Sequence, residues 1–205
     1  MIDIKSEEQG AIFNRNMLVG FSHLERDYAI HGHDFFEIEL ILGGYGESTI
    51  NGENVILKRG RINFMTTRDF HDIRNYNQED RLYLANIRFK QSILNPVILK
   101  KIFDVNQTLT FQLSKEETEF MDSVMHVMES TYNDGVMDSI SELMLTDMLE
   151  MIAIMLLKKT DVFKGERNGN YAHISRAISY LETNFYNNPT LAEAAEYVGL
   201  NKNYF

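Results

Sequence analysis

Short apolar runs separated by turn residues occupy the chain from about residue 17 to residue 90. The runs are FFEIELIL, YGESTI, NVILK, INFMT, FHDIRN and LYLANIRF. The turn signals between them include Gly43-Gly44, Asn51-Gly52 and Gly60. An Asn-Gly pair between two β-like runs predicts a two-residue hairpin, because both central positions of a type I′ turn require positive φ. Closely spaced strands of this length are typical of a small β-sandwich or barrel.

Beyond Pro96 the apolar positions recur at helical spacing. Capping boxes are predicted at Ser114 with Glu117 and at Ser139 with Glu142. The helix after the second box is predicted to run to about Lys159, with an apolar stripe too wide for a single contact. The stripe comprises Met144, Leu145, Met148, Leu149, Met151, Ile152, Met155 and Leu156. Eight of the eleven methionines lie between residues 121 and 155, and Met suits exchangeable contacts. The stripe therefore fits either core packing or a homodimer interface.

The last 45 residues are organised differently. Residues 161–172 are polar, contain two glycines and are predicted to be a linker. Thr190 and Glu193 form a third capping box at the start of a short helix. In that helix Ala195 precedes Gly199 by four residues, which is the spacing of a helix-turn-helix.

Composition narrows the class of protein. The 205 residues are 44% hydrophobic, enough for a buried core, and they include no cysteine, which excludes disulfides and thiolate zinc sites. The first residues resemble no targeting signal, and no apolar run approaches the length of a membrane helix, so we expect a soluble cytoplasmic protein without a membrane partner. The formal charge of −10 disfavours DNA binding by this chain alone.

Residues 176–205 resemble the opening of the DNA-binding region of the AraC family of bacterial transcription regulators. In that family the first helix is followed by a sLxxlAxxxgxSxxYf pattern, and this sequence reads TLAEAAEYVGLNKNYF. The resemblance implies that the chain stops inside the first helix-turn-helix, leaving at most Asn201, Lys202 and Asn203 of its base-reading residues. We therefore expect no complete DNA-binding set in this chain, and operator DNA as a partner of the full-length protein only.

With that family in view, the β-rich part resembles the cupin barrels that AraC-type regulators carry. The first cupin motif, H-x-H followed by E and G, is matched by His31, His33, Glu37 and Gly44. The second motif is matched by Gly60, His71 and Asn75, with Thr66 and Arg68 in place of its proline and glycine. The resemblance implies an α+β fold. Its parts are a cupin-like double-stranded β-helix (jelly-roll) barrel for effector binding at 1–95, a helical dimerisation region at 96–160, the linker at 161–172, and an incomplete DNA-binding domain at 173–205.

The histidines leave three interpretations open. Alternate residues of a strand share a face, so His31, His33 and Glu37 are expected to point the same way, and a closed barrel would bring His71 to them. These four residues suit Fe, Mn, Ni, Cu or Zn. They could hold a divalent metal, bind a small molecule without metal, or be satisfied polar residues near the barrel mouth.

Other residues are candidates for the same pocket. Glu39 shares the parity of Glu37, Asn86 and Arg88 share a face of a later strand, and Tyr28 and Phe35 are suited to stacking on a ligand. The predicted ligand-binding set is His31, His33, Glu37, Glu39, His71 and Arg88.

We interpret the chain as the ligand-sensing, dimer-forming part of an AraC-family regulator that binds a small-molecule effector, for which sugars are one class. The interpretation is that it is not an enzyme. The alternative is a metal-dependent cupin isomerase or dioxygenase, which would have no need of the C-terminal helix-turn-helix pattern.

Overall fold

The computed structural model describes residues 3–5, 16–76, 79–105, 108–133, 137–160, 180–181, 184 and 189–199. The chain forms two compact units. One comprises Met1–Leu94 and Thr108–Ile152, and the other comprises Asn95–Gln107 and Ala153–Phe205. The β-rich unit carries the residues that the sequence singles out, so it is described first.

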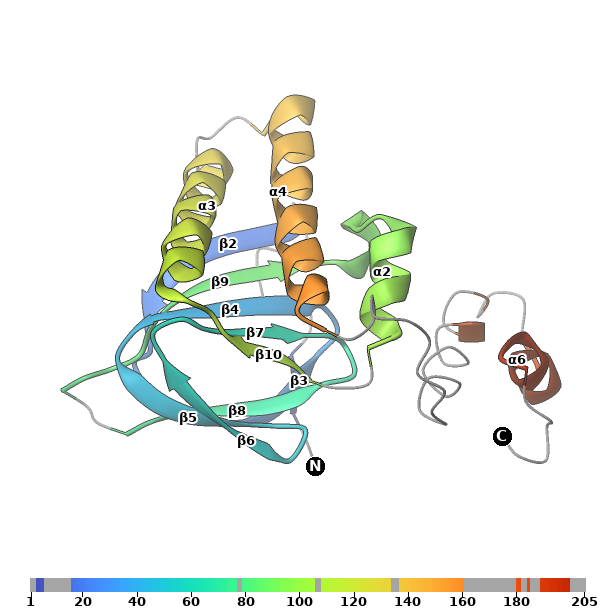
Figure 1. Ribbon diagram of the computed structural model, residues 1–205, viewed down its shortest axis with the longest axis horizontal. Helices are drawn as coiled ribbons and strands as arrows, with labels where there is room; N and C mark the ends of the chain where they lie inside the picture. The colour runs from blue at the N-terminus through green and yellow to red at the C-terminus, as the bar shows by residue number, and fades with distance from the viewer. Residues whose placement is uncertain are drawn as a thin grey trace. The chain divides into compact units, whose positions relative to one another are not determined.

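Two five-stranded sheets face each other to form a cupin-like barrel (Figure 1). The first sheet has the order β1 (Asp3–Lys5), β3 (Tyr28–His33), β8 (Phe70–Asn75), β5 (Tyr45–Ile50), β6 (Glu53–Lys58). The second has the order β10 (Leu109–Gln112), β7 (Arg61–Met65), β4 (Phe36–Gly43), β9 (Tyr83–Phe89), β2 (Met17–His23). The β1–β3 pair is parallel, and the other described pairs are antiparallel. The barrel followed by helices confirms the predicted α+β class.

The β5–β6 connection is the hairpin that Asn51-Gly52 predicts. Asn51 has a φ of 51° and Gly52 a φ of 87°, so both central residues of the turn are left-handed. The ladder on either side pairs Ile50 with Glu53 and continues to Tyr45 with Lys58. The Asn51 amide also donates to Asp69 at 2.6 Å, which ties this turn to the loop before β8.

The second sheet has two chemically different faces, because its strands alternate. On β4, Phe36, Ile38 and Leu40 point outward and are fully buried, while Glu37 and Glu39 point into the barrel. Phe36 packs edge-to-face with Phe64 and Phe89 of the neighbouring strands. This outward apolar face is the one against which a helix can pack.

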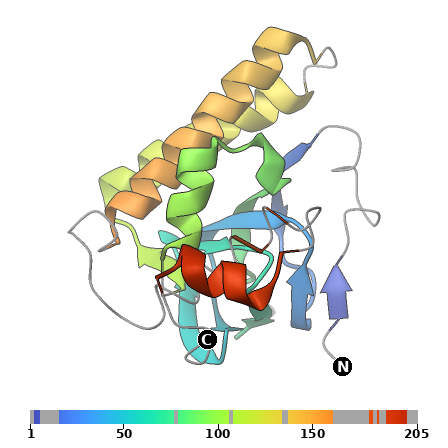
Figure 2. The same ribbon diagram turned by 90° about the vertical axis from the view of Figure 1, so that its right-hand side faces the viewer.

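Two antiparallel helices accompany the second sheet. The first, α3 (Lys115–Asn133), contacts β2 and β4, and its His126 ring stacks on Phe21 of β2 with centroids 4.0 Å apart. The second, α4 (Ser139–Lys158), runs antiparallel to α3 and lies next to it in both views (Figures 1 and 2). Along α4 the buried apolar residues are Leu145, Leu149, Ile152, Ala153, Leu156 and Leu157, whereas Ile140, Leu143, Met144 and Ile154 are exposed. The wide apolar stripe is therefore only partly covered.

The predicted caps are confirmed at two helices and corrected at a third. Ser114 and Glu117 exchange both bonds of a capping box before α3, and Thr190 and Glu193 do so before α6 (Leu191–Tyr197). The cap of α4 is Asp138 rather than Ser139, because the Asp138 carboxylate accepts from the Ser141 N–H at 2.7 Å. Asp is as good an N-cap as Ser, and the prediction failed by one residue.

Some elements were not predicted, and some predictions lie outside the described residues. Strand β10 lies in a range predicted to be helical, and the short helix η2 (Gln91–Ile93) after β9 was not predicted. Helix α2 (Pro96–Phe103) lies in the range predicted to be helical. The predicted linker, most of residues 173–188 and Asn201–Asn203 lie outside the described residues. Over the part of the chain that is described, none of the helices is long and apolar enough to cross a membrane.

Candidate functional site

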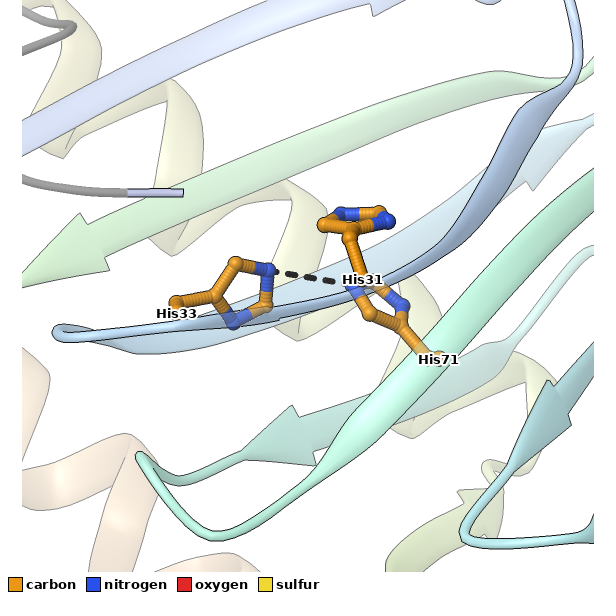
Figure 3. Close-up of side chains that lie close together, drawn as sticks. All are labelled: His31, His33 and His71. Carbon is orange, nitrogen blue, oxygen red and sulfur yellow. Dashed lines mark hydrogen bonds between the residues drawn. The ribbon is translucent and has the colours of Figure 1, made fainter. Parts of the chain in front are cut away.

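Three histidines from neighbouring strands of the first sheet meet inside the barrel (Figure 3). His31 of β3 lies directly opposite His71 of β8 in the ladder, and His33 follows two residues later on β3. The Nε2 atoms of His33 and His71 are 3.1 Å apart, and the ring centroids of His31 and His71 are 4.4 Å apart. All three side chains are buried. The two cupin-like motifs are thus brought together as the resemblance implied.

Glu37 reaches the histidines from the opposite sheet, which corrects one step of the sequence argument. The strand that carries His31 and His33 ends at His33, and β4 begins at Phe36 in the other sheet. Glu37 Oε2 lies 3.1 Å from His33 Nε2 and 3.5 Å from His71 Nε2. The residues converge because the chain crosses between two facing sheets at residues 34–35, and not because they share one strand face.

A chain of hydrogen bonds fixes the Glu37 carboxylate. Asn86 Nδ2 donates to Glu37 Oε1 at 2.6 Å, and Arg88 Nε donates to Asn86 Oδ1 at 3.1 Å. Both donors lie on β9, where Arg88 is the ladder partner of Glu37 and Asn86 the partner of Glu39. Arg88 therefore acts on the carboxylate through Asn86, at the edge of the histidine cluster.

The electrostatics of the cluster keep Glu37 ionised and His71 neutral. Burial alone would raise the pKa of Glu37, but the His33 hydrogen bond, the positive charges that His33 and His71 carry when protonated, and the Asn86 amide together hold it well below its usual range. Burial lowers the pKa of His71 to about 4, against the opposing pull of Glu37. At neutral pH, His71 is thus a neutral imidazole with a lone pair to offer.

Glu39 is the least compensated group of the site. Burial and the nearby charge of Glu37 raise its pKa well above the usual range, while Asn63 and Arg88 oppose the shift. Its side chain is 2% exposed, and Oε2 has no hydrogen-bond partner among the described residues. The sequence missed Asn63, which lies opposite Glu39 on β7 and accepts from Thr110 of β10 at 2.7 Å. A polar residue inside the apolar run INFM was the available signal.

The donor atoms are close enough to share one ion. One atom each of His31, His33 and His71 lie within 4.8 Å of one another, and so do one atom each of Glu37, Glu39 and His71. Bonds of about 2.0–2.2 Å place neighbouring ligands of one ion roughly 3–3.5 Å apart, as in the His33–His71–Glu37 spacing. His31 Nδ1 lies 2.8 Å from the Ala29 carbonyl oxygen. When Nδ1 is protonated, such a contact fixes the tautomer and the ring orientation of a metal-ligating histidine.

The remaining candidates have structural roles or lie at the edge of the cluster. Phe35 stacks on the His33 ring with centroids 4.7 Å apart, and Tyr28 is exposed beside His31. Asn75 accepts from the Leu82 N–H and donates to the Leu24 carbonyl, so it ties loops together outside the site.

The departure from the second motif is compensated locally. Thr66 stands where the motif has proline, and its N–H and hydroxyl both donate to Asp69, at 2.6 and 2.7 Å. The Asp69 N–H in turn donates to the Thr66 carbonyl. The turn that presents His71 is therefore held by a carboxylate instead of by a proline ring.

Comparison with known proteins identifies this architecture. The sequence model of the family described as the AraC-like ligand binding domain matches residues 19–139. The chain belongs to this family. The AraC-like match spans the barrel from β2 to the first residue of α4, and it includes the histidine cluster, Glu37, Glu39, Asn86 and Arg88.

Individual relatives agree with the family. The AraC-like chain is 25% identical over 165 residues to the HTH-type transcriptional activator RhaS of Citrobacter koseri, a match covering 76% of this chain and 55% of RhaS. The chain thus spans about half the length of that relative.

Two solved proteins share the fold. Apo ToxT of Vibrio cholerae strain SCE256 superposes with a TM-score of 0.54 at 12% identity, covering 92% of this chain and 72% of ToxT. Its unsaturated fatty acid-bound form gives 0.51 at 12%, covering 92% and 71%. The AraC-like transcriptional activator CuxR gives 0.54 at 11%, covering 92% and 68%. At these identities the likeness concerns the fold.

Proposed function

We propose that the chain senses a small-molecule effector, which binds in the polar part of the barrel interior. The proposed lining is His31, His33, Glu37, Glu39, His71 and Arg88. The observation that carries the proposal is the burial of five ionisable side chains, contributed by both sheets, in the ligand-binding domain family. Burying such groups is unfavourable for folding alone, so their concentration at one place indicates a site.

The chemistry of the lining favours a neutral polyhydroxylated ligand, such as a sugar, or a cation. Neutral imidazoles and carboxyl groups both accept and donate hydrogen bonds to hydroxyls. A free organic acid would place its charge beside the ionised Glu37, and Arg88 already donates to Asn86. The fatty acid in ToxT belongs to that protein and does not set the ligand of this one.

A ligand screen by thermal shift tests this proposal. A ligand at one hundred times its Kd stabilises the folded state by about 2.7 kcal/mol, which a melting curve resolves. We expect hits among sugars, polyols or cations, and loss of the shift in Glu37→Gln and Arg88→Ala. The matched control is Ser48→Ala, a buried polar residue whose hydroxyl donates to the Asp72 carbonyl and not to a residue of the proposed lining. A ligand that shifts all of these variants as it shifts the unaltered chain binds elsewhere.

As a second candidate function, we propose that His31, His33, Glu37 and His71 hold a divalent transition metal, which would orient the effector. Support comes from the spacing of 3.1–3.5 Å between the donor atoms of His33, His71 and Glu37, which suits ligands of one ion. Metal analysis of protein prepared without chelator checks this, with His33→Ala as the comparison. Equal and negligible metal in both would remove the metal and leave the effector proposal intact.

We propose a regulatory role without catalysis, which sets aside the isomerase or dioxygenase alternative. RhaS is a transcriptional activator by name, and the match to it covers 76% of this chain. Turnover of a candidate substrate by the chain loaded with Fe²⁺ or Mn²⁺ would reverse this ranking.

The fold offers a route from the barrel to the helices. Gly60 ends the β6–β7 turn with a φ of +84°, and its N–H donates to Ile41 of β4, two residues from Glu39. A Cβ at Gly60 would lie 2.7 Å from the Thr118 hydroxyl in the first turn of α3. We propose that a ligand among the histidines biases α3 and α4 through this junction, which requires different ligand affinities in the two states.

We propose that the protein is a homodimer through the helical pair. The exposed apolar residues Ile140, Leu143 and Met144 of α4, with Phe120 and Val127 of α3, supply an apolar surface. Sedimentation at tens of micromolar should give a dimer, and Leu143→Glu should give a folded monomer. A monomeric unaltered chain at that concentration would contradict the interface.

Operator DNA is proposed as the partner of the full-length regulator, which would place it in the cytoplasm. Residues 167–205 carry three basic and three acidic side chains, so this segment has no net positive charge for phosphate binding. A gel shift at physiological salt should show no specific operator binding by the 205-residue chain.

A further inference from the structure

We propose that Glu39, which belongs to neither cupin-like motif, is an additional direct ligand of the metal, and that its loss weakens Mn²⁺ binding more than Zn²⁺ binding. The inference rests on the metal site proposed above and adds a residue to it. With Glu39, the metal ligands would be three imidazoles and two carboxylates, rather than three imidazoles and one carboxylate.

The geometry places Glu39 within reach of the ion. One carboxyl oxygen of Glu39, one of Glu37 and one ring nitrogen of His71 all lie within 4.8 Å of one another. His71 also belongs to the histidine group, so the two groups share one residue. An ion bound by His71 and Glu37 would therefore have the Glu39 carboxyl as its neighbour.

Glu39 is also short of partners in a way that an ion would correct. It is 2% exposed, Oε2 accepts no hydrogen bond from the described residues, and among them no Lys or Arg forms an ion pair with it. A buried carboxylate needs a cation or several donors to be tolerated. Its neighbour on the same strand face is another carboxylate, Glu37, so a divalent cation is the charge that suits the pair.

The donor set determines which ion gains most from Glu39. Zinc in proteins is satisfied by about four ligands, whereas Mn²⁺ and similar ions take about six with a preference for oxygen. Three imidazoles and Glu37 already complete a four-ligand shell. A fifth ligand that is a carboxylate therefore adds more to Mn²⁺ than to Zn²⁺ and still leaves one position for an effector oxygen or water.

Calorimetric titration of the chelator-treated chain tests the inference, with MnCl₂ and ZnCl₂ used separately at one pH. The variants are Glu39→Gln, Glu39→Asp and the control Ser48→Ala. We expect Glu39→Gln to weaken Mn²⁺ by about tenfold or more, and Zn²⁺ by less than about threefold. Glu39→Asp keeps the charge but withdraws it by one methylene, so its Mn²⁺ affinity should be intermediate. Ser48→Ala should bind both ions as the unaltered chain does.

The outcomes separate the two proposals. Mn²⁺ binding that is unchanged in Glu39→Gln, or Zn²⁺ binding that falls as far as Mn²⁺ binding, overturns the role of Glu39 and leaves the metal site standing. Failure of both ions to bind the unaltered chain overturns the metal site and this inference together. Melting curves without metal identify a variant that does not fold, and the other Glu39 variant then decides.

Discussion

The barrel interior has two halves that are equally buried and chemically opposite. The apolar half is the cluster of Leu24, Ile41, Ile50, Val55, Leu57, Ile73, Leu82 and Leu84. The polar half is the group of His31, His33, Glu37, Glu39 and His71. Both halves draw residues from both sheets, and they share strands: β4 contributes Glu37 and Glu39 to one half and Ile41 to the other.

This chemical difference separates the residues that stabilise the barrel from the residues that are proposed to bind its ligand. Burying the apolar cluster stabilises the fold by roughly 25 cal/mol for each Å² removed from water. Burying five ionisable groups opposes folding, because desolvation raises the pKa of Glu39 and lowers that of His71. Under the proposed function the polar half binds the ligand, and the apolar half provides the stability that offsets the cost of burying it. Mutations in the two halves should accordingly have opposite signatures.

The largest expected effect is Leu57→Ala in the apolar half. Leu57 is fully buried, and truncating such a residue removes hydrophobic burial and leaves a cavity, which should lower the free energy of unfolding by about 2–5 kcal/mol. Urea denaturation measures the loss. Binding of effector or metal by the folded fraction should change less than about threefold. A Leu57→Ala variant that keeps its stability but loses binding would remove the division between the halves.

The second effect is a pH dependence from His71 in the polar half. Its pKa is about 4 in the folded state against 6.5 for an ordinary histidine. Between these pH values the unfolded chain therefore binds a proton at this residue that the folded chain does not bind. Lowering the pH from 7.5 to 5 should therefore reduce the free energy of unfolding by about 2 kcal/mol through this residue. His71→Asn should lack this part of the decrease.

Urea denaturation without metal at the two pH values checks the His71 prediction. Glu37 titrates below this window, so it does not mask the difference. If the unaltered chain and His71→Asn lose the same stability between pH 7.5 and pH 5, His71 is not the neutral, desolvated group described above.

A third effect has the opposite sign. The folded state holds a proton on Glu39 at pH values where the unfolded state has released it, since its pKa is raised, so the stability of the unaltered chain falls as pH rises above about 4.5 through this residue. Glu39→Gln removes that loss and should stabilise the metal-free chain by about 1 kcal/mol at pH 7. The gain should shrink toward pH 4. Destabilisation at pH 7 would show that Glu39 is better satisfied than its contacts indicate.

The apolar half and the hairpins were predictable from local patterns. Asn51-Gly52 predicts its turn because both central positions of a type I′ turn require positive φ, and the capping boxes at Ser114 and Thr190 are formed by residues close in sequence. The fold class and the meeting of His31, His33 and His71 followed from the two motifs. These features depend on neighbours in the sequence or on a recurrent family pattern.

The rest of the site depended on which sheet each strand joins. The alternation of side chains along a strand does not reveal that the chain crosses to the other sheet after His33. The proximity of Glu37 to the histidines was therefore predicted for an incorrect reason. Asn63 was missed because its importance comes from lying opposite Glu39 in the β4–β7 ladder. Thr110 was missed because it lies opposite Asn63 on β10, a strand in a range that was predicted to be helical. Long-range pairing was the missing information in each case.

The smallest expected effect is that of replacing Ser48, which is polar and buried like the histidine cluster but has a hydrogen-bond partner. Its side chain is 1% exposed, and its hydroxyl donates to the Asp72 carbonyl at 2.6 Å. Ser48→Ala should lower the free energy of unfolding by about 1 kcal/mol, the net value of one such hydrogen bond. The difference from the unaltered chain should be the same at pH 5 and pH 7.5, since a hydroxyl carries no charge in this range.

The pH dependence of the stability loss in Ser48→Ala would show whether the polar half is distinguished by polar groups in general or by its unsatisfied ionisable groups. A loss for Ser48→Ala that varies with pH as His71→Asn does would mean that the two halves are electrostatically coupled, and the binding site would then extend past the histidines toward β5. A constant loss would confine the site to the groups that titrate. Three of these groups have an atom with no hydrogen-bond partner among the described residues: Oε2 of Glu39 and Nδ1 of His33 and His71.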